Sequence, residues 1–206
     1  MMKKEVFSLL LVLVCLGVAV ILAGNFSVTG HLVFDSQGQL VPDESVVGYW
    51  KLDGDALDSS GNGNDGVING ADCEVDGRFG KGCGFDGDGD YIQVMSSDSV
   101  NISESLTISA WVKANRWGVA EVFNRILIRR ENDEQAYQLD TCNGDCGNQN
   151  SFSFFVHSDV CGGSRTCGAR TNTPMNSDTW YHVVGVYDHT VPDATIYVNG
   201  VLDNIN

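Results

Sequence analysis

Residues 105–113 read SLTISAWVK, the clearest β-strand pattern in the chain. Leu106, Ile108, Ala110 and Val112 are apolar and occupy alternate positions, which is the period of a strand with one buried side. No stretch with the helical period of 3.6 residues lasts for more than two turns. This segment therefore predicts an all-β fold.

Further short strands are expected on both sides of this segment. A hairpin is indicated by Asn199-Gly200, the dipeptide best suited to a two-residue type I′ turn. The chain has 24 Gly and only 3 Pro among 206 residues, as expected for many tight turns. Short strands at regular intervals are typical of a sandwich or jelly roll. The expected strands lie at residues 46–52, 91–94, 125–129, 136–139, 151–157, 179–187 and 195–202.

The formal net charge is −15. Nucleic acid is not an expected partner, because so acidic a chain has little with which to neutralise a row of phosphates. Two interpretations of the acidity remain open, namely solubility and calcium binding by clusters of Asp.

The N-terminus indicates export. Lys3 and Lys4 precede an apolar run over residues 6–24, near the upper limit for a signal-peptide core and the lower limit for a spanning helix. We expect residues 1–24 to be a hydrophobic helix that serves as a cleaved signal peptide or an N-terminal membrane anchor. Residues 25–45 are then a spacer and residues 46–206 the β-sandwich, placed outside the cell.

Six cysteines follow the apolar segment. An even number in an exported domain favours disulfides, although a zinc site is the alternative. Cys73–Cys83 is the predicted pair, because the short loop between these residues is rich in Gly. The pairing of the other four is left open: Cys142, Cys146, Cys161 and Cys167.

A series of motifs over residues 46–206 resembles the laminin G-like, concanavalin A-like lectin/glucanase superfamily. The resemblance implies an antiparallel jelly-roll β-sandwich. Relatives carry one or two strands after the Asn-Gly hairpin, so we expect the sandwich here to lack its last strand or strands. The motifs are GYWKLD (48–53), DSSGNGNDG (58–66), GRFGK (77–81), FDGDGDYI (85–92), LTISAWV (106–112), WYHVV (180–184), YD (187–188) and IYVNG (196–200).

Glycosidases share this fold and place a carboxylate trio on one strand, with alternate side chains pointing into a cleft. The nearest match is the acidic stretch 131–136, where Ala136 occupies a position that should be acidic. We interpret this stretch as a turn and expect no enzymatic activity.

Calcium is the one expected cofactor. Asp86, Asp88 and Asp90 alternate with Gly, so hard oxygen ligands can converge on one ion. In relatives of this fold the first long loop, residues 53–65 here, lies near the same end of the sandwich as the segment that contains Asp86, Asp88 and Asp90. The predicted ligands are Asp86, Asp88, Asp90, Asp58 and Asn62.

A ligand edge is expected from exposed aromatic and basic residues, because sugar rings stack on aromatic faces. Trp50, Trp111 and Trp180 lie on strands and are expected in the core. Trp117 lies in a loop, and the predicted edge combines it with Arg116, Arg165 and Arg170.

The expected function is a non-catalytic, extracellular binding module for a glycan or a cell-surface protein. It meets the membrane only through its N-terminal segment. Two alternatives remain open: a glycoside hydrolase or lyase on the same fold, and a structural spacer in an adhesin.

Overall fold

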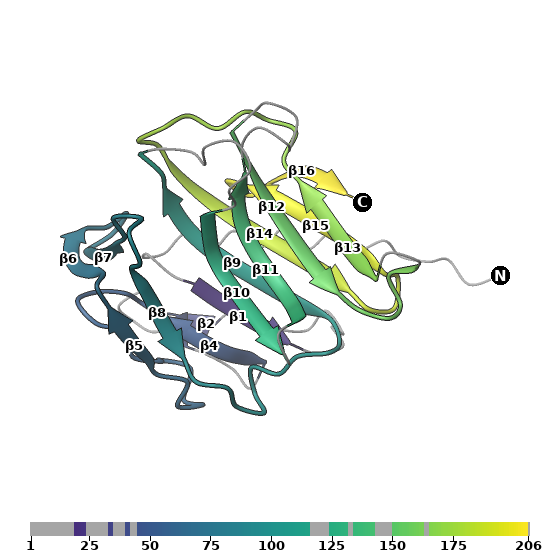
Figure 1. The fold of residues 1–206 in the computed structure, drawn as a ribbon, viewed down its shortest axis with the longest axis horizontal. Helices are drawn as coiled ribbons and strands as arrows, with labels where there is room; N and C mark the ends of the chain where they lie inside the picture. The colour runs from purple at the N-terminus through teal and green to yellow at the C-terminus, as the bar shows by residue number, and fades with distance from the viewer. Residues whose placement is uncertain are drawn as a thin grey trace.

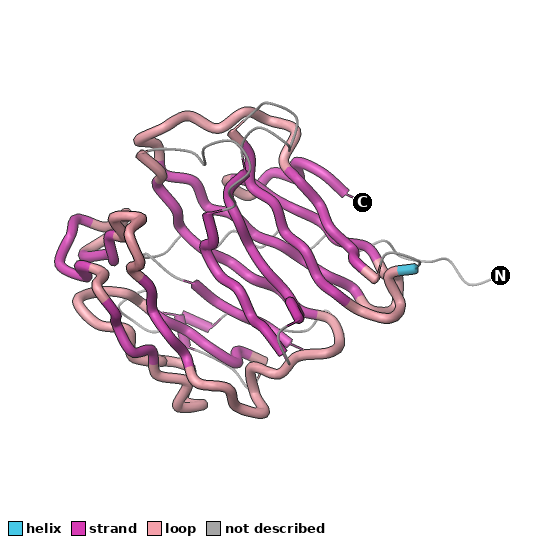
Figure 2. The backbone as a smooth tube through the Cα atoms, viewed as in Figure 1, coloured by secondary structure: helices cyan, strands magenta, loops and turns pink. Residues whose placement is uncertain are grey.

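The computed structural model describes residues 19–23, 33–34, 40–41, 45–115, 124–131, 134–142, 150–162 and 165–205. These residues form an antiparallel β-sandwich (Figure 1). The one helical assignment among them is a 3₁₀ turn at Gly162 (Figure 2). No helix in this described part is long and apolar enough to cross a membrane.

The larger sheet has six strands in the order β16-β15-β14-β9-β1-β4. Every neighbouring pair is antiparallel. The strands are β1 (Ala19–Ala23), β4 (Val46–Trp50), β9 (Leu106–Lys113), β14 (Trp180–Asp188), β15 (Asp193–Val198) and β16 (Val201–Ile205).

The second sheet has four antiparallel strands and lies in front of the first in Figure 1. Its strands are β10 (Asn124–Glu131), β11 (Glu134–Cys142), β12 (Ser151–His157) and β13 (Thr166–Arg170). Glu131 ends β10 and pairs with Glu134, where β11 begins, so residues 131 and 134–136 of the predicted turn are strand residues, and residues 132 and 133 lie outside the described residues.

Three two-stranded ribbons complete the fold. They pair β2 (Val33–Phe34) with β3 (Leu40–Val41), β5 (Gly66–Asn69) with β8 (Tyr91–Val94), and β6 (Asp72–Asp76) with β7 (Lys81–Gly84). The last two ribbons lie together beside the sandwich in Figure 1.

The N-terminal segment differs in part from the prediction. Ala19–Ala23 lies between β9 and β4 and is extended, where the sequence predicted helix. Residues 1–18, with Cys15 among them, lie outside the described residues. The signal peptide or anchor remains a prediction.

The core lies between the two sheets. Leu106 and Ile108 from β9 pack with Leu139 from β11 and Phe154 from β12, and all four are almost fully buried. Gly185 on β14 allows the sheets to approach, because a Cβ there would lie 2.3 Å from Cγ of Phe154. Each buried aromatic or aliphatic side chain of this kind contributes roughly 1.5–3 kcal/mol.

The tryptophans divide between the two faces of the larger sheet. Trp50 lies in the core, as predicted, and its Nε1 donates to the carbonyl of Asn64 over 2.8 Å. The prediction of core packing was wrong for Trp111 and Trp180. Side chains alternate between the two faces of a sheet, and because Ile108 faces the core, Trp111 and its neighbour Trp180 lie on the outer face. Trp111 instead packs against His182 there, with ring centroids 5.2 Å apart.

Candidate functional site

A row of polar side chains crosses the outer face of the four-stranded sheet. Arg125 of β10 is opposite Asp140 of β11, Asp140 is opposite Ser153 of β12, and Ser153 is opposite Arg170 of β13. Residues directly opposite each other in a sheet project from the same face. Their chain neighbours Leu139, Phe154 and Ala169 are core residues, so the row points away from the core.

An ion pair forms the first half of this row. Nη1 of Arg125 donates to Oδ2 of Asp140 over 2.7 Å. The Asp140 side chain is fully buried, whereas the Arg125 side chain is 31% exposed. Burial raises the pKa of Asp140 to about 6, and the hydrogen bond and charge of Arg125 offset only part of that rise. At neutral pH the carboxylate is therefore mostly ionised.

Several polar atoms of this face have no hydrogen-bond partner. They are Oδ1 of Asp140, Oγ of Ser153, Nε of Arg170 and Oε1 of Gln138, which lies two residues before Asp140 on the same face. Gln138, Asp140 and Ser153 are all at least nine-tenths buried. Buried polar groups in proteins are almost always satisfied by protein, ordered water or a ligand. Four such atoms make this face the candidate site, and because all four are shielded from solvent, the half-buried and exposed side chains around them form its accessible part.

An aromatic ring lies beside the row. Phe155 of β12 is opposite Gln138 on one side and Gly168 of β13 on the other. A Cβ on Gly168 would be only 2.0 Å from Cδ1 of Phe155, so the ring lies across the Gly168 backbone. The Arg170 guanidinium carbon is 5.3 Å from the ring centroid. Phe155 and Arg170 are both half-buried and thus within reach of solvent.

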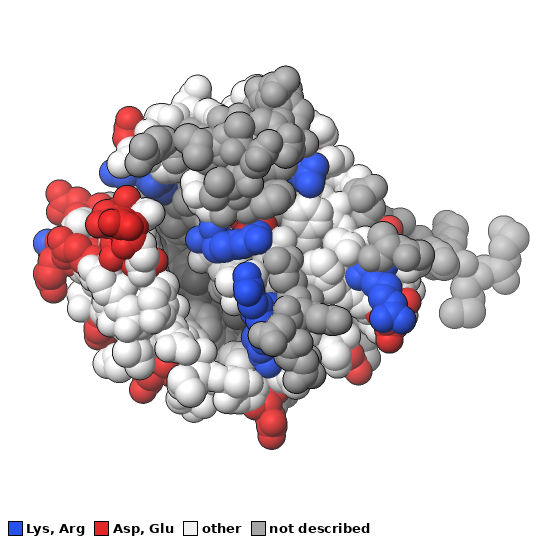
Figure 3. All heavy atoms as spheres, in the orientation of Figure 1, with Lys and Arg blue, Asp and Glu red and all other residues white. Residues whose placement is uncertain are grey.

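The four-stranded sheet is less acidic than the chain as a whole. Its strands contain four Arg, at positions 125, 129, 130 and 170, and three carboxylates, Glu131 and Glu134 at the β10–β11 turn and Asp140 in the row. Figure 3 shows Lys and Arg over β10, whereas the acidic side chains of this view gather at the side where β6 and β7 lie. An anion approaching this face would meet more positive charge than the net charge suggests.

The predicted ligand edge is only partly present. Arg170 belongs to the row described above, but Arg165 lies at the opposite end of β13. Nε of Arg165 is 3.4 Å from Oδ1 of Asp159, and both side chains are largely exposed. Arg116 and Trp117 lie outside the described residues. Arg165 and Arg170 therefore do not form one site.

Two of the predicted calcium ligands stabilise the first long loop. Oxygens of Asp58 accept hydrogen bonds from the backbone N–H groups of Tyr49, Ser60 and Asn64 and from the Ser60 hydroxyl. Burial alone would raise the pKa of Asp58, but these bonds lower it below its ordinary value. Nδ2 of Asn62 donates to the carbonyl of Val46. Both residues thus hold the loop against β4.

The other three predicted ligands form an exposed turn. Oδ1 of Asp86 accepts from the backbone N–H of Asp88, and Oδ2 of Asp90 accepts from that of Asp86. Gly87 and Gly89 have φ of 85° and 91°, which permits the tight turn. No group of three or more His, Cys, Asp or Glu in the described part of the chain is arranged to hold a metal. Calcium binding by Asp86, Asp88 and Asp90 remains a prediction.

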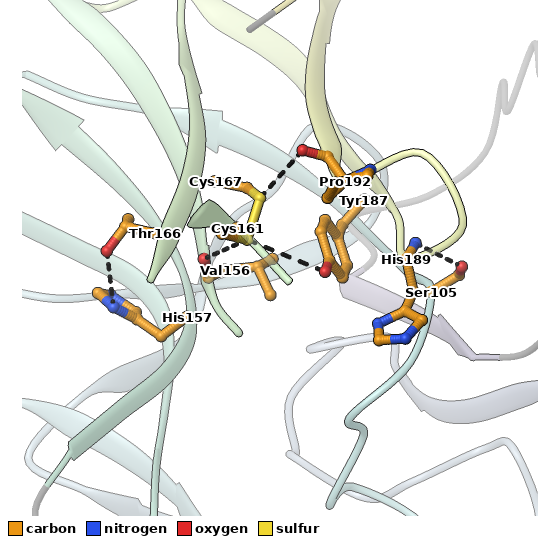
Figure 4. Close-up of a disulfide and its surroundings, with 9 residues drawn as sticks. All are labelled: Ser105, Val156, His157, Cys161, Thr166, Cys167, Tyr187, His189 and Pro192. Atoms are coloured by element: carbon orange, nitrogen blue, oxygen red, sulfur yellow. Dashed lines mark hydrogen bonds between the residues drawn. A yellow bond between two sulfur atoms is a disulfide. The ribbon is translucent and has the colours of Figure 1, made fainter. Parts of the chain in front are cut away.

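Two disulfides are present among the described residues. Cys73–Cys83 joins β6 to β7, as predicted. Cys161–Cys167 closes the β12–β13 connection, and its sulfurs approach the carbonyl of Pro192 and the hydroxyl of Tyr187 (Figure 4). Cys142 ends β11, and Cys146 lies outside the described residues. Disulfides of this kind are typical of extracellular proteins.

The sequence analysis did not identify most of the outer-face site. A signal was available in β12, SFSFFVH, where Ser151 and Ser153 alternate with buried aromatic residues. Gln138 and Asp140 likewise alternate with Tyr137 and Leu139 in β11. This alternation is the ordinary pattern of a strand with one face in the core, so it predicts an outer polar face but does not distinguish a binding site from a solvated surface.

Comparison with known proteins agrees with this architecture. The family model described as the concanavalin A-like lectin/glucanases superfamily matches residues 86–206, more than half of the chain, including all four strands of the site. No match was found among curated proteins or among solved structures. The chain belongs to the concanavalin A-like lectin/glucanase superfamily.

Proposed function

We propose that the chain is an extracellular, non-catalytic carbohydrate-binding module whose ligand contacts the outer face of β10–β13. The observation that carries the proposal is the group of four polar atoms without a hydrogen-bond partner, on Gln138, Asp140, Ser153 and Arg170, next to the half-buried ring of Phe155. Sugars are recognised by this combination, because their rings stack on aromatic faces while their hydroxyl groups exchange hydrogen bonds with polar side chains.

The solvent-accessible members of the site would make the first contacts. They are Arg125, Phe155 and Arg170. Asp140 holds Arg125 through the 2.7 Å ion pair, so the guanidinium is presented in a fixed position. A preorganised polar group loses less conformational entropy on binding than a free one.

Binding without catalysis is supported by the number of carboxylates. Glu131 and Glu134 lie at the turn end of β10 and β11, and among the described side chains of the polar row Asp140 is the single carboxylate, paired with Arg125. Hydrolysis by the usual glycosidase route needs two carboxyl groups on either side of the scissile bond.

An extracellular position is supported by the two disulfides and by the superfamily. The predicted export segment, residues 1–24, would also place the sandwich outside the cell; its residues 19–23 form β1 in the larger sheet.

Binding of the full chain to an array of glycans tests the proposal. We expect a defined group of glycans to bind, and Phe155→Ala to weaken binding at least tenfold, which is about 1.4 kcal/mol. Phe85→Ala is the matched control, because Phe85 is 51% exposed on a different part of the molecule. Equal effects of the two substitutions, or no glycan bound by a folded chain, would contradict the proposal. Release of reducing sugar would favour the hydrolase instead.

A further inference from the structure

Within the proposed carbohydrate site, we infer that Phe155, Gly168 and Arg170 form a subsite for a sugar that bears a carboxylate, a uronate residue. The sugar ring stacks on Phe155, and the carboxylate pairs with the Arg170 guanidinium. This inference rests on the proposed function, because it names the ligand class of the same face.

Gly168 determines how the ring lies. Its φ is not in the left-handed region, so backbone conformation does not explain a glycine here. Glycine within a strand costs stability and often marks a close approach. Here the approaching group is Phe155, since Cδ1 and Cε1 would lie 2.0 and 2.4 Å from a Cβ on Gly168. Because Gly168 has no side chain, the Phe155 ring can lie against the backbone of β13.

Arg170 supplies the positive charge, and its guanidinium lies over the Phe155 ring. Its guanidinium carbon is 5.3 Å from the Phe155 centroid, and its backbone carbonyl accepts from Nδ2 of Asn204 over 2.9 Å. The two ion pairs found among the described residues join Arg125 to Asp140 and Arg165 to Asp159. No protein carboxylate among those residues therefore neutralises Arg170, and its buried Nε has no acceptor.

An anionic ligand suits these features better than a neutral one. Guanidinium groups bind carboxylates through two parallel N–H···O bonds, and bonds between charged groups are about twice as strong as neutral ones. A sulfate ester offers similar oxygens, so the shared chemistry is an anionic sugar. We assign the carboxylate because it is planar and matches the fork of Arg170.

Calorimetric titration of the full chain with an oligogalacturonate, its neutral galactose counterpart and a sulfated galactose oligomer tests this inference. We expect the uronate to bind at least tenfold more tightly than the neutral sugar. Arg170→Gln should remove that preference, whereas Arg165→Gln, at the other end of β13, should keep it. Gly168→Ala should weaken both sugars, because the ring must tilt away from the new Cβ. Melting curves confirm that each variant is folded.

The outcomes separate this inference from the proposed function. The uronate subsite would be overturned if the wild type and Arg170→Gln both bound neutral sugar and uronate equally. If Phe155→Ala then lost this binding, the proposed carbohydrate site would still be supported. Tighter binding of the sulfated oligomer would overturn the carboxylate assignment. Failure of all glycans to bind a folded chain would overturn both.

Discussion

Asp140 lies in an environment that differs strongly from water. Its carboxylate is fully buried, and burial raises its pKa to about 6, compared with about 3.9 in an unfolded chain. Between these two values the folded protein binds more protons than the unfolded protein. The contribution of Asp140 to stability is therefore lost as pH rises from about 4 to about 6.

Asp140→Asn should remove this contribution. We expect the free energy of unfolding of the wild type, relative to that of the variant, to fall by on the order of 2 kcal/mol between pH 4 and pH 7. Urea denaturation at several pH values measures the difference, and subtraction cancels the opposite pH dependence of other groups, such as buried His182 with its lowered pKa. Parallel pH profiles for the two proteins would show that Asp140 titrates normally.

The pKa of Asp58 is shifted in the opposite direction. Burial would raise it, but the hydrogen bonds from Ser60, Tyr49 and Asn64 outweigh burial and lower it. Asp58→Ala should leave three backbone N–H groups without their acceptor and lower the free energy of unfolding by about 2–3 kcal/mol. The exposed Asp98→Ala serves as control and should change it by less than about 0.5 kcal/mol. The effect of Asp58→Ala should shrink below about pH 4, since the stabilisation by Asp58 is lost as its carboxylate protonates. An unchanged free energy of unfolding in Asp58→Ala would mean that Asp58 does not hold the loop.

At the scale of strands, the sequence predicted the elements with regular alternation. The expected segments 91–94 and 151–157 coincide with β8 and β12, and the expected segment 105–113 begins one residue before β9. The Asn199–Gly200 turn is confirmed too, since both residues have positive φ, 51° and 78°. Local side-chain pattern and turn chemistry are sufficient for such elements.

β13 was not predicted, and this omission concealed the site. In its sequence TCGAR only two small apolar residues, Cys167 and Ala169, alternate with Gly168 and Arg170, which is too short and weak a pattern to predict a strand. Without β13 the alignment of Arg170 with Ser153 and Asp140 cannot be inferred. Strand register depends on pairing between residues distant in the chain, which local pattern does not encode.

The two disulfides stabilise elements of different kinds. Cys73–Cys83 closes the two-stranded β6–β7 ribbon, whereas Cys167 is buried in the sandwich core. We expect Cys73→Ser with Cys83→Ser to raise hydrogen exchange in β6 and β7 alone, because an isolated two-stranded ribbon is marginally stable. Cys161→Ser with Cys167→Ser should lower the free energy of unfolding of the whole sandwich by about 2–3 kcal/mol. Exchange spreading through both sheets in the first variant would contradict this division.

At the scale of the whole molecule, the calcium prediction now depends on Asp86, Asp88 and Asp90, because protein donors occupy the oxygens of Asp58. Exposed carboxylates of extracellular modules bind calcium at about 0.1–1 mM. We expect millimolar calcium to raise the melting temperature by a few degrees, since a ligand held only by the folded state stabilises it. Asp88→Ala should abolish the rise and Asp98→Ala should keep it. Identical melting curves in calcium and in excess chelator would leave the Asp-Gly repeat as a turn.

The proposed ligand binds the outer face of the four-stranded sheet. Hydrogen–deuterium exchange of the full chain, with and without the glycan that binds most tightly in the array, tests this binding most directly. Amides of β11, β12 and β13 should exchange more slowly in the complex, while those of β5–β8 should be unchanged. Protection confined to the acidic ribbons β5–β8, with none in β11–β13, would contradict the claim.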